Sequence, residues 1–157
     1  MSVMETIHIN DDIKIFYTTA KSFPDGIMDA FNELHSKVPA SDNRIYYGIS
    51  RPENGHITYK AAVEELYNGE AEKLGFEKMI IKKGLYACTT IKDFMKNTPE
   101  IGKAFQELLT SPDLDPNGYC VEWYLNDQDV MCMVRLNDDT KRNKSSNKQM
   151  SQQRESV

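Results

Sequence analysis

The stretch Gly118-Tyr119-Cys120-Val121-Glu122-Trp123-Tyr124-Leu125 decides how the whole chain is interpreted. It is rich in aromatic and β-branched residues, and it lies between a turn signal at 116–118 and a second one at 126–127, so it predicts a strand. Side chains alternate between the two faces of a strand. Glu122 therefore shares a face with Cys120 and Tyr124, whereas Val121 and Trp123 take the other face.

Glu122 is the one carboxylate in this otherwise apolar run. Burying an unpaired acid costs free energy, so the side chain either faces water or meets a cationic or hydrogen-bonding partner. We expect Glu122 to point into a space with aromatic walls, and the rest of the chain to supply those walls.

Composition narrows the class of protein. The 157 residues predict one domain over 1–137 and a disordered basic tail over 138–157 that is rich in Lys, Ser, Asn and Gln. Residues 141–157 hold five basic residues and one acidic residue, so the remainder has a net charge of −9. An acidic body argues against direct nucleic-acid binding, and it suits a cationic small molecule or a basic protein partner.

The three cysteines have no metal-like spacing, and each lies in an apolar, strand-like run. They predict buried free thiols in a reducing compartment. We see no secretory signal and no apolar run long enough to cross a membrane, so we predict a cytoplasmic protein with no metal site and no cofactor.

The remaining elements follow from periodicity and turn signals. Residues 7–20 predict a strand with a bulge or turn at Asp11-Asp12. A helix is expected from the segment Ser22-Pro24 to near Pro39, and a second from Thr98-Pro99 to Ser111-Pro112. Further strands are expected at 44–50, at 76–91 with a turn or bulge at 82–84, and at 130–136, with one helical turn at 70–74. Periodicity alone leaves 56–65 open between strand and helix.

The same order of elements occurs twice, at about 13–65 and about 76–136: a strand, a helix with a proline near its start, a glycine-containing strand, a turn and a strand. This duplication predicts an α+β fold of two pseudo-symmetric strand-helix-strand-strand repeats. The antiparallel sheet would have its helices on one face and a ligand groove between the repeats. Because the second copy ends in a strand, the duplication also favours a strand for 57–65.

Several stretches together resemble the GyrI-like small-molecule-binding domain, the effector-binding domain of multidrug-responsive transcription regulators. They are Tyr46-Tyr47-Gly48, Ile57-Thr58-Tyr59, Ile81-Lys82-Lys83-Gly84-Leu85-Tyr86-Ala87, and above all 118–125 with its closing strand. The resemblance covers about residues 7–136. It implies a central groove for lipophilic, often cationic, aromatic compounds, with the pocket carboxylate at Glu122.

The resemblance also implies wall residues at Tyr124, Tyr86, Tyr46 and Tyr47. Tyr46, Tyr86 and Tyr124 are equally compatible with ordinary amphipathic strand positions with wet hydroxyls. By alternation Trp123 packs under a helix, unless a bulge turns it into a pocket wall. The first strand starts so early that no DNA-binding helix-turn-helix fits before it, which indicates a stand-alone member.

The leading hypothesis is a binder of small lipophilic, cationic molecules that acts as a sensor or sequestering protein. One alternative is a hydrolase of reactive cyclopropane-type compounds in which Glu122 acts as general base and tyrosine hydroxyls stabilise the oxyanion. The sequence offers no nucleophile–His–acid set, so no catalytic residue is assigned. The other alternative is a protein-interaction module of the gyrase-inhibitor kind.

Overall fold

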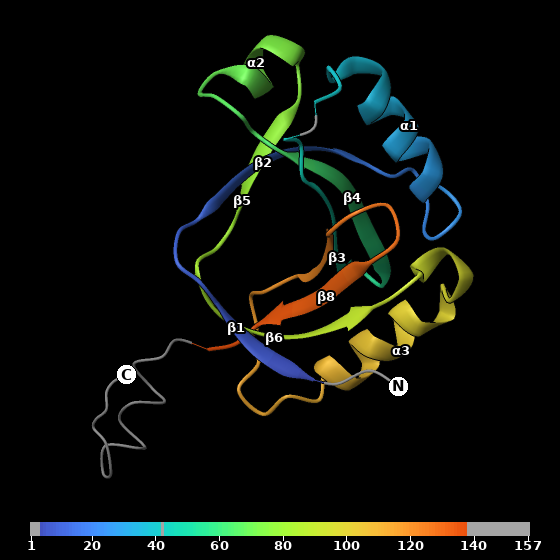
Figure 1. Ribbon diagram of the computed structural model, residues 1–157, viewed down its shortest axis with the longest axis vertical. Coiled ribbons are helices and arrows are strands. Elements are labelled where there is room, and N and C mark those ends of the chain that lie inside the picture. The colour runs from blue at the N-terminus through green and yellow to red at the C-terminus, as the bar shows by residue number, and fades with distance from the viewer. Residues whose placement is uncertain (1–3, 42, 138–157) are drawn as a thin grey trace.

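The computed structural model describes residues 4–41 and 43–137. They form one eight-stranded antiparallel sheet that curls into a half-barrel, with helices on one face (Figure 1). This confirms the predicted α+β fold class. The predicted tail at 138–157 lies outside the described residues.

The elements occur in two similar sets. The first set contains β1 (Glu5–Ile9), β2 (Ile13–Thr19), α1 (Ile27–Lys37), β3 (Tyr46–Glu53) and β4 (His56–Glu64). After the short helix α2 (Glu70–Leu74), the second set contains β5 (Glu77–Ile81), β6 (Gly84–Ile91), the 3-10 turn η1 (Phe94–Lys96), α3 (Pro99–Leu108), β7 (Cys120–Tyr124) and β8 (Val130–Arg135). The ambiguous segment 56–65 is a strand, as the duplication predicted.

The strand order β1-β6-β8-β7-β3-β4-β2-β5 shows how the two sets are joined. The centre of the sheet is the β3–β7 pair, one strand from each set, with Gly48 opposite Glu122. The edge strands are exchanged, since β1 pairs with β6 of the second set and β5 pairs with β2 of the first. The expected strand over 7–20 is therefore two strands, and the turn at the Asp pair sends them to opposite halves of the sheet.

The two long helices differ in how well their starts were predicted. Pro99 opens α3 with Thr98 before it, as expected. Helix α1 begins only at Ile27, because residues 22–26 form a turn in which the Gly26 N–H donates to the Ser22 carbonyl oxygen at 3.2 Å.

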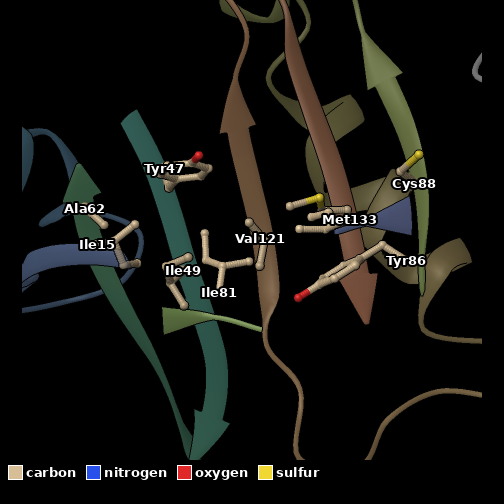
Figure 2. Packing of buried hydrophobic residues seen from close by; sticks show 10 residues of the cluster. Ile15, Tyr47, Ile49, Ala62, Ile81, Tyr86, Cys88, Val121 and Met133 are labelled. Atoms are coloured by element: carbon tan, nitrogen blue, oxygen red, sulfur yellow. The ribbon is translucent and has the colours of Figure 1, made fainter. Parts of the chain in front are cut away.

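Buried side chains form three clusters. Helix α1 covers Phe16, Ala61 and Val63 on β2 and β4, and helix α3 covers residues of β6 and β8 that include Ala87 and Cys132. The third cluster fills the helix-free, concave face of the sheet (Figure 2). It draws residues from both ends of the sheet, Ile9 and Tyr86 from β1 and β6 and Ile15 and Ile81 from β2 and β5, and this shared core stabilises the curl.

Two further predictions from the sequence concern free cysteine thiols and the lack of a membrane-spanning segment. The cysteines are free; Cys88 and Cys132 are buried and Cys120 is partly buried. No described helix is both long and apolar enough to cross a lipid bilayer.

Candidate functional site

Glu122 lies in the middle of β7, and its neighbours across the sheet are Gly48 on β3 and Cys132 on β8. The strand is paired residue by residue without a bulge. The alternation predicted from sequence holds, because Cys120 and Tyr124 pack with the α3 cluster on the helix face and Val121 packs in the concave cluster. The Glu122 side chain therefore points to the helix face, between the regions covered by α1 and α3.

Two tyrosine hydroxyls hold the Glu122 carboxylate. The Tyr59 hydroxyl donates to Oε1 at 2.7 Å and the Tyr124 hydroxyl donates to the same atom at 2.5 Å. Burial raises the pKa of Glu122 above its ordinary value, and the two donated hydrogen bonds lower it by less. Among residues 4–41 and 43–137, no lysine or arginine forms an ion pair with this carboxylate.

Gly48 makes this arrangement possible. A Cβ atom at position 48 would lie 2.0 Å from the Tyr59 hydroxyl oxygen and 2.5 Å from Glu122 Oε1. Both distances are far below van der Waals contact, so any larger residue would push the two groups apart. The glycine in the Tyr46-Tyr47-Gly48 stretch thus leaves the space that the Tyr59 hydroxyl and the carboxylate of Glu122, its partner across the sheet, occupy.

Aromatic rings from several elements surround the two tyrosines. Phe31 of α1 contacts both rings edge to face, with centroids 6.3 Å from Tyr59 and 5.8 Å from Tyr124. Phe94 of η1 lies 5.4 Å from Tyr124, and Phe23 stacks on Tyr59 at 6.0 Å. Because Phe31 and Phe94 come from different repeats, the ring cluster spans the junction between the two halves.

The raised pKa values of the groups around Glu122 keep the tyrosine hydroxyls and the nearby thiols neutral at neutral pH. Burial raises the pKa of both Tyr59 and Tyr124, and the Glu122 charge raises them further. Burial and then Glu122 raise the pKa of Cys120 to about 11, and burial and then Glu122 and Cys120 raise that of Cys132 to about 12. Neither thiol is therefore an activated nucleophile at neutral pH.

The structure separates the six residues predicted as ligand-binding. Tyr46 lies on the helix face with Glu122 and Tyr124, since it pairs with Tyr124 across the sheet, and its ring lies 4.7 Å from that of His35. Tyr47, Tyr86 and Trp123 belong to the concave cluster on the other face.

The expectation that Trp123 packs under a helix is wrong. Trp123 pairs with Tyr47 on β3, and the two rings lie 5.7 Å apart within the concave cluster. Sequence alternation places Trp123 opposite Glu122 correctly, but it does not say which face of the sheet carries the helices.

Sequence reasoning missed Tyr59, Phe31, Phe94 and Phe23 as neighbours of the acid. Tyr59 is 1% exposed and is brought to Glu122 by the β3–β4 hairpin register, which pairs it with Ser50. The signal was present in the alternation of Tyr59, Ala61 and Val63, which places them on one strand face. Phe31 recurs at helical spacing with other apolar residues of its helix, and that pattern alone does not distinguish a core residue from a wall of a site.

The described residues contain no group of three or more His, Cys, Asp or Glu side chains arranged to hold a metal ion. Chemically, the Glu122 cluster offers one desolvated acid, two hydroxyl donors and several ring faces.

No family model matches the sequence, and no curated protein matches it significantly. Several solved structures share the fold. An integron cassette protein from the mobile metagenome of Vibrio cholerae has a TM-score of 0.64 at 12% identity, over 85% of this chain and 95% of that one. A hydrolase from Listeria innocua has a TM-score of 0.57 at 12% identity, with 85% and 91% covered.

The C-terminal domain of EcmrR is also similar, with a TM-score of 0.58 at 5% identity over 88% of this chain and 98% of that domain. At such low identities these likenesses establish a common fold and no more. That common fold is consistent with the resemblance to GyrI-like domains drawn from the sequence.

Proposed function

We propose that the chain is a GyrI-like binding protein that takes up small lipophilic, cationic aromatic molecules at Glu122. The observation that carries this proposal is the state of the acid: its carboxylate is desolvated, bound only by neutral hydroxyls, and unpaired with any described cation. A carboxylate in low-dielectric surroundings attracts a cation more strongly than one in water does.

The rings around the acid supply the lipophilic part of the site. Phe31, Phe94, Tyr59 and Tyr124 offer faces and edges on which an aromatic cation can stack, with cation–π attraction of roughly 0.5–2 kcal/mol per ring. Stacking on rings tolerates many scaffolds, so we expect broad selectivity. A sensor or a sequestering protein would both use such a site.

Phe23 marks the route by which a ligand reaches the acid. Its side chain is 45% exposed, it stacks on Tyr59, and it also lines an open recess of about 480 Å³ bounded by residues 19–23 and 56–58. We propose that a ligand enters through this recess and displaces the Phe23 ring from Tyr59, which itself donates to Glu122.

A matched pair of ions tests the proposal. Tetraphenylphosphonium and tetraphenylborate have nearly the same shape and opposite charge. We expect the cation to raise the melting temperature of the wild-type protein and the anion not to do so. The Glu122→Gln variant keeps the shape of the site and removes its charge, so its affinity for the cation should fall about tenfold or more.

Glu64→Gln is the control, because Glu64 is a partly buried acid near Tyr47 on the concave face, where burial and then the Glu64 charge raise the pKa of Tyr47. It should bind the cation as the wild type does. Equal stabilisation of wild type and Glu122→Gln by the cation, or equal effects of the two ions on the wild type, would refute a site built on the Glu122 charge.

A hydrolase remains the second candidate, and one observation favours it. A carboxyl whose pKa burial raises is a stronger general base than an ordinary one, and two phenol donors stand beside it. Turnover of an electrophilic cyclopropane substrate that is lost in Glu122→Gln and retained in Glu64→Gln would establish this activity. Binding without turnover would leave the non-enzymatic proposal in place.

A further inference from the structure

The concave face of the sheet carries a recess that the Glu122 site does not use. It has a volume of about 150 Å³ and lies where β5, β6, β8 and the segment leading into β7 come together. Its apolar walls are Ile49, Met79, Ile81, Tyr86, Tyr119 and Val121. Figure 2 shows Tyr86 directed from β6 towards the side on which Val121 and Ile81 lie.

The size of the recess limits what fits inside it. An apolar protein cavity of about 150 Å³ accommodates a single benzene ring. The walls that would hold such a ring are well fixed. The Tyr86 hydroxyl donates to the Lys82 carbonyl oxygen at 2.5 Å, and the Tyr119 ring is held under the guanidinium of Arg51, 4.6 Å from its centroid.

The polar groups at the rim leave one positive charge uncompensated. Arg135 also lines the recess, but it donates to the Lys83 carbonyl oxygen at 2.8 and 2.9 Å and to the Asp115 carboxylate at 3.0 Å, so its charge is balanced. Lys82 is exposed at the rim and has no ion-pair partner among the residues that the structure describes.

We propose that this recess is a second binding site, for small aromatic monocarboxylates, with the ring among the apolar walls and the carboxylate at Lys82. Charge complementarity selects an anion, because Lys82 is the rim charge left without a partner. A second carboxylate on the ligand would face Asp115, so a monoanion fits better than a dianion.

This site is independent of the one at Glu122. Val121 lines the recess on the concave face, whereas its neighbour Glu122 points to the helix face of the same strand. The sheet separates the two sites, so a ligand of one does not touch the side chains of the other. The two sites also have opposite charge preferences.

Methyl-selective NMR of the full chain, titrated with sodium benzoate, tests the proposal. We expect shifts for the methyl groups of Met79, Ile49 and Ile81, and none for Met28 on α1. Benzyl alcohol has the ring without the charge, benzylamine has the opposite charge, and acetate has the charge without the ring. Each should bind more weakly than benzoate.

Adjacent lysines provide the matched variants, since Lys82 lines the recess and Lys83 does not. Both are exposed, so neither substitution threatens the fold. Lys82→Gln should weaken benzoate binding roughly fivefold. Lys82→Arg keeps the charge and should retain most of the wild-type affinity, and Lys83→Gln should leave the affinity within twofold of wild type. Benzylamine binding as tightly as benzoate, equal effects of the two glutamine variants, or no shift of the recess methyls would each overturn the proposal.

Discussion

Two glutamates in this protein are withdrawn from solvent in opposite ways. Glu70 opens α2 with a side chain that is 2% exposed, and it meets the guanidinium of Arg44, itself 4% exposed, in a two-pronged ion pair. It also accepts the Leu66 N–H at 2.9 Å. Glu122 receives only the hydroxyls of Tyr59 and Tyr124.

The contrast separates a structural acid from a candidate functional one. The hydrogen bonds from Arg44 hold the pKa of Glu70 below its ordinary value, whereas burial holds that of Glu122 above it. The Glu70 charge is neutralised by Arg44, and this ion pair links α2 to the segment before β3. Glu122 has donors but no cation, so a cationic ligand would supply what its own chain does not.

The largest effect expected from this contrast is on stability. Glu70→Gln leaves the Arg44 charge buried without its partner, which should lower the free energy of unfolding by about 3–5 kcal/mol. Glu122→Gln removes a desolvated charge and keeps an oxygen that accepts from both tyrosines, so the change should stay within about 1 kcal/mol. Urea unfolding monitored by Trp123 fluorescence measures both.

Glu100→Gln is the control for loss of an ion pair as such, because Glu100 and Lys103 are paired at the surface. It should leave the urea midpoint almost unchanged. Losses of similar size for Glu70→Gln and Glu122→Gln would show that the two acids serve the same structural purpose, and the contrast would fail.

The same two acids show what sequence can and cannot predict. Alternation in 118–125 places Glu122 with Cys120 and Tyr124, and a repeated order of elements predicts the fold class and the strand at 56–65. Both inferences use local periodicity, which the chain keeps when it folds. Nothing local predicts that β1 and β5 exchange halves, because partner choice within a sheet depends on contacts distant in sequence.

The missed parts of the site have the same origin. Tyr59 reaches Glu122 only through the combined register of β4 with β3 and of β3 with β7. The Arg44–Glu70 pair joins residues that sequence reasoning assigned to separate elements, with no pattern to connect them. A strand's two faces can be told apart from sequence, but the face that a helix will cover cannot.

An intermediate effect is expected at Gly48, which tests whether the Glu122 cluster is tightly fitted. Gly48→Ala places a methyl group 2.0 Å from the Tyr59 hydroxyl oxygen, and Tyr59 is too buried to move freely. We expect a loss of about 1–3 kcal/mol in the free energy of unfolding, as is usual for an overfilled core. Differential scanning calorimetry is a suitable measurement.

The control for Gly48→Ala is Gly102→Ala in α3, where a new methyl group would meet no atom within 4 Å. Alanine favours a helix, so this change should stabilise the protein by up to about 1 kcal/mol. If Gly48→Ala were as harmless as Gly102→Ala, the hydroxyl and carboxylate would not be held as closely as the contrast with Glu70 requires.

The smallest effect is in the pH dependence of stability, where the two acids should act with opposite sign. The lowered pKa of Glu70 gives stability that is present at neutral pH and is lost as the pH falls below 4.5 towards its folded value. The raised pKa of Glu122 means that the folded state holds its proton longer, so its contribution is favourable at low pH and is lost as the pH rises above 4.5 through its folded value.

One proton can change the unfolding free energy by at most about 1.4 kcal/mol per pH unit. Wild type and Glu122→Gln, compared by urea unfolding from pH 4 to pH 8, should therefore diverge as the pH rises, with the variant gaining relative stability. The difference between wild type and Glu70→Gln should change with the opposite sign: wild type is the more stable at neutral pH, and its advantage should shrink as the pH falls, mainly below pH 5. A Glu122→Gln difference that is flat across the range would mean that this carboxyl titrates alike in the folded and unfolded states, and a ligand's charge would then find no desolvated acid to pair with.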